Sequence, residues 1–156
     1  MPPLGGQYRT MSGRSLSAGI DARLKGKILP SLGKAGYHEM QAVIQESVPL
    51  VPVDTGALRA SNYAAEPTYS GMRVHVEAGY GGVATKINPE TLEPTTTYAL
   101  AVHENLQAHH KVGQAKFLST PFEARMGGMT ARMAAFVQRD LRGANPVAEP
   151  GKGEGE

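Results

Sequence analysis

The stretch Val51-Pro-Val-Asp-Thr-Gly-Ala-Leu-Arg-Ala-Ser61 lies between a helical pattern and a strand pattern, so it marks the change from helix to sheet along the chain. Pro52 ends the preceding helix, because the residue before a proline is pushed out of the α region. Asp54 and Thr55 carry short polar side chains that bond their own nearby backbone, and Gly56 tolerates a left-handed or close-packed position. The stretch therefore predicts a structural turn at these three residues, joining a helix to a sheet.

The residues before this turn predict a long helix that is kinked near Pro30. Apolar side chains recur at helical spacing on both sides of the proline: Leu16, Ile20, Leu24 and Ile28 precede it, and Tyr37, Met40, Val43, Ile44 and Val48 follow it. A proline inside a helix removes a backbone donor and bends or breaks the helix. One kinked helix and two helices that meet at Pro30 both fit this pattern.

The residues after the turn predict an antiparallel sheet of three or more strands. Met72–Tyr80 alternates apolar with polar side chains, the pattern of a half-buried strand. Ser70-Gly71 is a turn signal, so residues 60–69 are expected to pair with that strand as a hairpin. Pro67 indicates that this partner is an edge strand or is bulged. Thr96–Val102 is predicted to be the third strand.

The end of the domain predicts a second helix. Thr120-Pro-Phe-Glu123 has the pattern of a capping box with proline at the first helical position, and Gly143 ends the apolar periodicity. Long irregular stretches are expected at 81–94 and 105–115, on either side of the third strand. The fold class is α+β. We expect the two helices, 17–48 and 119–143, to pack together over one face of the sheet.

Length and composition predict one domain with short flanking arms. The chain has 156 residues, of which 17–143 form the predicted domain, and the Pro/Gly-rich ends 1–16 and 144–156 are expected to be mobile. The chain has no cysteine, which excludes disulfides and fits a reducing cytoplasm. No apolar run approaches the roughly 20 residues of a membrane span. No cofactor motif is present, and a net charge of +2 does not by itself indicate nucleic-acid binding.

The triplet Asp54-Thr55-Gly56 also occurs at the active site of aspartic peptidases. Two carboxylates must share a proton there, which a symmetric dimer would supply from one Asp54 per chain. That fold is nearly all β, whereas here the triplet follows a long helix and another helix closes the chain. The turn is therefore the favoured interpretation, and a dimeric aspartic peptidase is a remote alternative.

Two clusters of side chains are candidates for binding sites. His103-Glu104 and His109-His110 lack the second histidine that a zinc-binding helix needs four residues after the first, because that position is Gln107, so no metal site is predicted. Basic residues fall seven apart on the last helix and are expected to face solvent or another subunit, with a DNA-binding face as the less favoured alternative. These residues are Arg125, Arg132 and Arg139.

Three blocks occur in order along the chain: Pro52-Val-Asp-Thr-Gly-Ala-Leu-Arg-Ala-Ser61, Tyr98-Ala-Leu-Ala-Val-His-Glu104 and Gly113-Gln-Ala-Lys-Phe-Leu-Ser-Thr-Pro121. With the long preceding helix and the closing helix, they resemble the tail-completion, or minor capsid, proteins of lambda-like tailed phages, prophages and gene-transfer agents. The resemblance covers about residues 18–142. The chain departs from the simplest members of that family by its insertion at 81–94 and by its Pro/Gly-rich ends.

The resemblance implies a structural protein of the virion neck rather than an enzyme, made in the host cytoplasm and incorporated at the head–tail junction. A ring of six copies is expected, with twelve as the alternative. Neighbouring neck rings, the portal adaptor and the tail-terminator or tail-tube protein are the expected partners, and genomic DNA in the channel is another candidate. A tail-terminator or head-closure ring is the alternative position in the neck. The expected contact residues are Arg59, Tyr98, His103, Glu104, His109, His110, Lys116 and Phe117.

Overall fold

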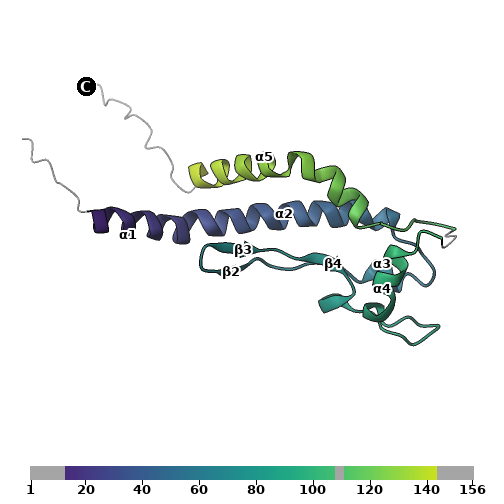
Figure 1. Ribbon diagram of the computed structural model, residues 1–156. Coiled ribbons are helices and arrows are strands. Elements are labelled where there is room, and N and C mark those ends of the chain that lie inside the picture. Colours follow the sequence, from purple (N-terminus) through teal and green to yellow (C-terminus); the bar gives the residue numbers. More distant parts are fainter. Residues whose placement is uncertain (1–12, 108–110, 144–156) are drawn as a thin grey trace, which may run out of the picture.

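The computed structural model describes residues 13–107 and 111–143, which form an α+β fold (Figure 1). Residues 1–12 of the predicted arm 1–16, the predicted tail 144–156 and the predicted contact residues His109 and His110 lie outside the described residues. The helical elements are α1 (Gly13–Arg23), η1 (Leu24–Ile28), α2 (Leu29–Ser47), η2 (Val48–Leu50), α3 (Ala57–Ala60), η3 (Gly82–Ala84), α4 (Thr95–Glu104) and α5 (Ser119–Gly143). The strands are β1 (Asn62–Ala64), β2 (Thr68–Ser70), β3 (Arg73–His75) and β4 (Ala78–Tyr80).

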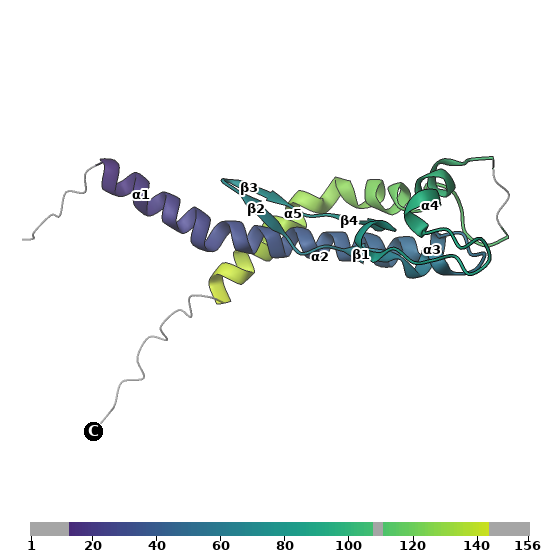
Figure 2. The same ribbon diagram turned by 90° about the horizontal axis from the view of Figure 1, so that it is seen from below.

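The N-terminal helix is one continuous rod that changes direction at η1, just before Pro30 (Figure 2). The segment η1 is a π-helical turn, and the backbone N–H of Leu29 bonds to the carbonyl of Leu24. Because proline cannot donate a backbone hydrogen bond, a local change of helical register before it accommodates the missing bond without breaking the rod. The kinked long helix is therefore the correct alternative. It begins at Gly13, four residues before the domain boundary placed at residue 17.

The hairpin predicted for residues 60–80 is confirmed, and it is divided by a bulge. Strand β1 pairs with β4 and β2 pairs with β3, both antiparallel. Three residues, 65–67, stand opposite two residues, 76–77, and the Ala65 N–H donates to the Glu77 carbonyl across this break (2.7 Å). Pro67 lies within the bulge, where its missing donor breaks no ladder bond.

The predicted third strand is wrong, because residues 95–104 form helix α4. The side chains that α4 buries recur at helical spacing, with Thr95 and Ala99 buried and Val102 packed against the core, while Leu100 points to solvent. Threonine, tyrosine and valine favour strands locally, but packing overrides that preference. Instead of a sheet of three or more strands, the described residues form two two-stranded sheets.

Helix α2 is the middle layer of the molecule (Figure 1). At Gly36 an added Cβ would lie 3.0 Å from Val76 of the hairpin and 3.6 Å from Met133 of α5. The expectation that both long helices cover one face of the sheet is therefore wrong: α5 packs on α2, and the hairpin packs on another side of α2. The predicted capping box also differs, because Thr120 lies within α5 and its N–H bonds to the Lys116 carbonyl (2.9 Å). No helix in the described ranges is long and apolar enough to cross a membrane.

Candidate functional site

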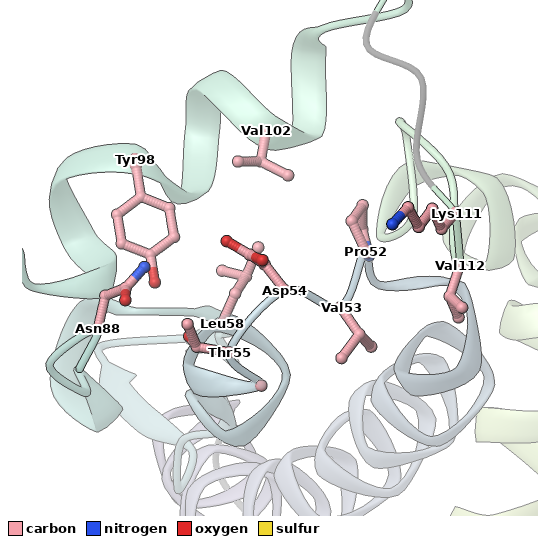
Figure 3. A pocket seen from close by; sticks show the side chains of 11 residues that line it. Pro52, Val53, Asp54, Thr55, Leu58, Asn88, Tyr98, Val102, Lys111 and Val112 are labelled. Carbon is pink, nitrogen blue, oxygen red and sulfur yellow. The ribbon is translucent and has the colours of Figure 1, made fainter. Parts of the chain in front are cut away.

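The turn between η2 and α3 leaves Asp54 exposed. Gly56 has a left-handed backbone (φ 81°), and the Thr55 hydroxyl accepts a long hydrogen bond from the Ala57 N–H (3.5 Å). Within the described part of the chain, the Asp54 carboxylate makes no hydrogen bond that would hold the turn. It points instead into an open cavity (Figure 3). Thr55 and Gly56 therefore shape the turn, and Asp54 is free to meet another molecule.

The cavity beside Asp54 has a volume of about 450 Å³ and is lined by both apolar and polar side chains. Asn88 and Tyr98 form one wall, and burial raises the pKa of the Tyr98 hydroxyl, partly opposed by a hydrogen bond with Asn88. Asp54 is the one carboxylate in the described lining, so a peptidase dyad would need a second chain. The full lining is Pro52, Val53, Asp54, Thr55, Gly56, Leu58, Asn88, Tyr98, Val102, Lys111 and Val112.

A second polar cluster joins α4 to the start of α5. The His103 Nδ1 lies 2.7 Å from the Glu104 carboxylate, and its Nε2 lies 3.3 Å from both the backbone nitrogen and the hydroxyl of Ser119. Lys116 pairs with the other oxygen of Glu104. Lys116 and then His103 lower the pKa of the Glu104 carboxyl.

His103 lies between Ser119 and Glu104, which is the arrangement of the nucleophile, base and carboxylate in a catalytic triad. The Ser119 backbone N–H, however, donates to the same Nε2, and a proton on His103 Nδ1 satisfies the contact with Glu104. The imidazole therefore bonds an N–H at the first turn of α5, which otherwise has no partner within the helix. The cluster is explained as a clamp between two helices.

The three sequence blocks meet in one core. Phe117 is 1% exposed and packs with Val51, Leu58 and Ala99. The rings of Tyr80 and His103 stand edge-on to the Phe117 ring, with centroids 5.1 and 4.9 Å away. Backbone bonds join the same segments: Gln114 N–H to the Leu50 carbonyl (2.8 Å) and Lys116 N–H to the His103 carbonyl (2.7 Å). Segments drawn from the whole stretch between Leu50 and Phe117 thus form a single structural unit.

Most of the predicted contact residues that are described hold this unit together from within. The Arg59 guanidinium donates to the Val51 carbonyl (3.1 Å), and Tyr98 lines the cavity. His103, Glu104, Lys116 and Phe117 form the clamp and the core described above.

The predicted arginine face has internal partners. Arg132 makes two hydrogen bonds to the Glu39 carboxylate (2.9 and 2.8 Å). Arg125 bonds Glu39 (3.1 Å) and Glu46 (2.6 Å) on the same helix α2. Arg139 lies over the Phe136 ring, 5.4 Å from its centroid. The carboxylates of α2 therefore neutralise two of the three arginines.

Several large apolar side chains that the sequence pattern did not single out are exposed on α4 and on the loops around it, and these segments lie at one end of the molecule (Figure 1). Leu92 and Leu106 are 75% exposed and Leu100 is 72% exposed. We call this set of residues the apolar end: Val53, Ile87, Leu92, Leu100, Leu106 and Val112. Helical periodicity over residues 95–104 places Leu100 opposite the buried side of α4. The strand predicted for this segment did not indicate that Leu100 is exposed.

Comparisons with protein-family models, with curated proteins and with solved structures found no match.

Proposed function

We propose that this chain is a structural protein of the neck of a tailed phage or of a related particle, and that it forms a ring that joins or completes the head–tail interface. The proposal begins from the resemblance of the three sequence blocks to the tail-completion family. The observation that carries it further is that these three separate blocks pack around Phe117 as one unit. A motif set that specifies one packed unit is a stronger basis for a resemblance than three separate matches.

The apolar end supports assembly with other copies or with neighbouring rings. Large apolar side chains gathered on one exposed surface are typical of protein–protein contacts. Three of them are more than 70% exposed, and the 450 Å³ cavity beside Asp54 opens among them, lined by Val53 and Val112. In a ring each copy offers one surface to one neighbour and a different surface to the next. The apolar end is the surface we assign to such a contact.

Electron cryo-microscopy of intact particles tests this function. Particles produced with a tagged chain should show a ring of this protein at the head–tail junction, and the map would count six or twelve copies. The same map would distinguish tail completion from a tail-terminator or head-closure position, because each lies at a different height in the neck. Absence of the chain from mature particles would overturn the proposal.

A further inference from the structure

Exposed cations gather at the end of the molecule opposite α3 and α4. The segment Gly13–Ile28 holds four basic residues and one acidic residue, a net charge of +3, whereas the whole chain carries +2. Arg23, Lys25 and Lys27 are exposed, and none of them has an anionic partner among the residues that the structure describes. This short segment therefore carries more positive charge than the rest of the chain, which has a net charge of −1.

The end of α5 adds cations to the same place. Helix α5 runs antiparallel to α2, since Arg132 meets Glu39 and Asp140 meets Lys34 (3.7 Å). Its last turn therefore lies near the start of α2 and touches η1, and it brings the exposed Arg142 there. Helix α1 projects beyond α5 and beyond the hairpin (Figure 1). We call Arg23, Lys25, Lys27 and Arg142 the basic end.

Several other cations of the molecule are occupied. Arg125 and Arg132 bind Glu39, and Lys116 binds Glu104. If one of these cations moved to another anion, its carboxylate partner would be left unpaired. Arg125, Arg132 and Lys116 are therefore poor candidates for contact with another molecule. Among the residues 13–107 and 111–143, no carboxylate pairs with the cations of the basic end, so we take their charge as available to a partner.

We infer that the basic end binds the phosphate backbone of double-stranded DNA. The choice of duplex DNA rests on the proposed function, because the genome passes through the neck. Residues 18–28 contain no aromatic residue, asparagine or glutamine, so they offer lysine and arginine to phosphates but few groups to read bases. The contact is therefore independent of the DNA sequence, and it weakens as the salt concentration rises.

The test measures binding of the purified full chain to a fluorescent duplex of about 30 base pairs over a series of salt concentrations. The triple variant Arg23→Gln, Lys25→Gln, Lys27→Gln should bind at least about tenfold more weakly at low salt. The slope of log affinity against log salt should fall in magnitude by up to about 2.7 per bound chain, because each of the three cations that contacts a phosphate contributes about 0.9. Circular dichroism checks that the variant is folded.

A matched control removes the same charge elsewhere. Arg73→Gln, Lys86→Gln, Lys111→Gln should keep affinity and slope close to those of the wild type, because these exposed cations lie on the hairpin and near the apolar end. Equal weakening in both triple variants, or in neither, would overturn the inference. Photo-crosslinking of the wild-type chain to the duplex needs no variant, and the adducts should map to residues 13–28 rather than 73–111.

This result and the neck proposal can fail separately. A ring at the head–tail junction whose triple variant still binds DNA normally would overturn the inference and leave the proposed function standing. If the chain binds DNA through the basic end but is absent from particles, the inference stands and the proposed function is overturned.

Discussion

Gly56 and Gly113 both have left-handed backbones, but only Gly113 is also enclosed. An added Cβ at Gly56 (φ 81°) would meet nothing within 4 Å, whereas at Gly113 (φ 87°) it would lie 2.5 Å from the Pro52 nitrogen and 2.6 Å from the Val51 carbonyl carbon. We expect Gly56→Ala to destabilise the fold by about 1–2 kcal/mol through backbone strain alone. Gly113→Ala should cost more, because the backbone it meets cannot move aside as a flexible side chain does.

Thermal unfolding of both variants measures this difference. Gly127→Ala is the control: Gly127 lies in α5 with open space around it, and the substitution should stabilise the protein by roughly 0.5–1 kcal/mol. If Gly113→Ala were no worse than Gly56→Ala, the packing of residue 113 against residues 51–52 would be contradicted.

The Tyr63 hydroxyl donates to the Glu77 carboxylate across the hairpin (2.5 Å). This hydrogen bond is the main cause, and burial the second cause, that raises the pKa of Tyr63 to about 12. The folded state therefore holds this proton more tightly than the unfolded state, whose tyrosine pKa is about 10. The stabilisation is fully present below pH 10 and is lost as pH rises from 10 towards 12. Ultraviolet titration should show late-ionising tyrosines, one of which moves towards 10 in Glu77→Gln; no change in that variant would contradict the assignment.

At this scale the sequence predicted what depends on the residue itself. The left-handed Gly56 follows from the chemistry of glycine in an Asp-Thr-Gly turn. The positive φ of Lys116 (56°) had no such signal, because the contacts of its neighbours impose it: its N–H bonds His103 and the adjacent Phe117 is buried in the core. Contacts between distant segments are invisible in any local pattern.

At the scale of elements, local preference identified the long helices and the hairpin but not α4. The bulge could be predicted because Pro67 constrains its own backbone. The segment 95–104 is short, and its threonines, tyrosine and valine favour strands. Its helical form depends on contacts outside the segment: Ala99 is buried in the core that includes Phe117, and the buried Thr95 bonds Lys86. A window of ten residues contains no information about those contacts.

The packing of α5 on α2 depends on Glu39, whose side chain is buried between two arginines. Hydrogen bonding to Arg132 is the largest cause that lowers the pKa of Glu39, and Arg125 adds to it against the effect of burial. Because the pKa of Glu39 is lower in the folded state, its ionised carboxylate stabilises the fold at pH values above the unfolded pKa of 4.5. That stabilisation is lost as the pH falls through the folded pKa. The α2–α5 contact should therefore loosen in acid.

The variant Glu39→Gln keeps the shape and removes the charge. It should lower the free energy of unfolding at pH 7 by about 1–2 kcal/mol, a reduced figure because water partly screens the half-exposed Arg132. Chemical denaturation at pH 7 and at pH 3 measures the effect, and the gap between variant and wild type should shrink in acid. Asp21→Asn on α1 is the control. An equal gap at both pH values would show that the charge of Glu39 is not what stabilises the contact.

At the scale of the whole molecule, the sequence placed Arg125, Arg132 and Arg139 on a binding face because their partners are about 80–90 residues away. Glu39 and Glu46 lie on α2, and only the antiparallel packing of α5 brings them within hydrogen-bond distance. With those charges paired internally, the surfaces that we assign to partners are the apolar end and the basic end, which lie at opposite ends of an elongated molecule. The proposed protein contact and the proposed DNA contact would therefore not compete for one surface.

The apolar end should control ring formation, and Leu92→Asp with Leu100→Asp tests this. Both side chains are more than 70% exposed, so the fold should survive, and Asp tolerates the left-handed backbone of residue 92 (φ 61°). If each leucine is buried in the ring, losing both costs at least about 3 kcal/mol per contact, roughly a 100-fold weaker association. Analytical ultracentrifugation should show rings for the wild type and monomers for the variant. Ile20→Asp with Met72→Asp, exposed apolar residues elsewhere, should leave the rings intact, whereas loss of rings in both variants would mean that general surface hydrophobicity, not the apolar end, drives assembly.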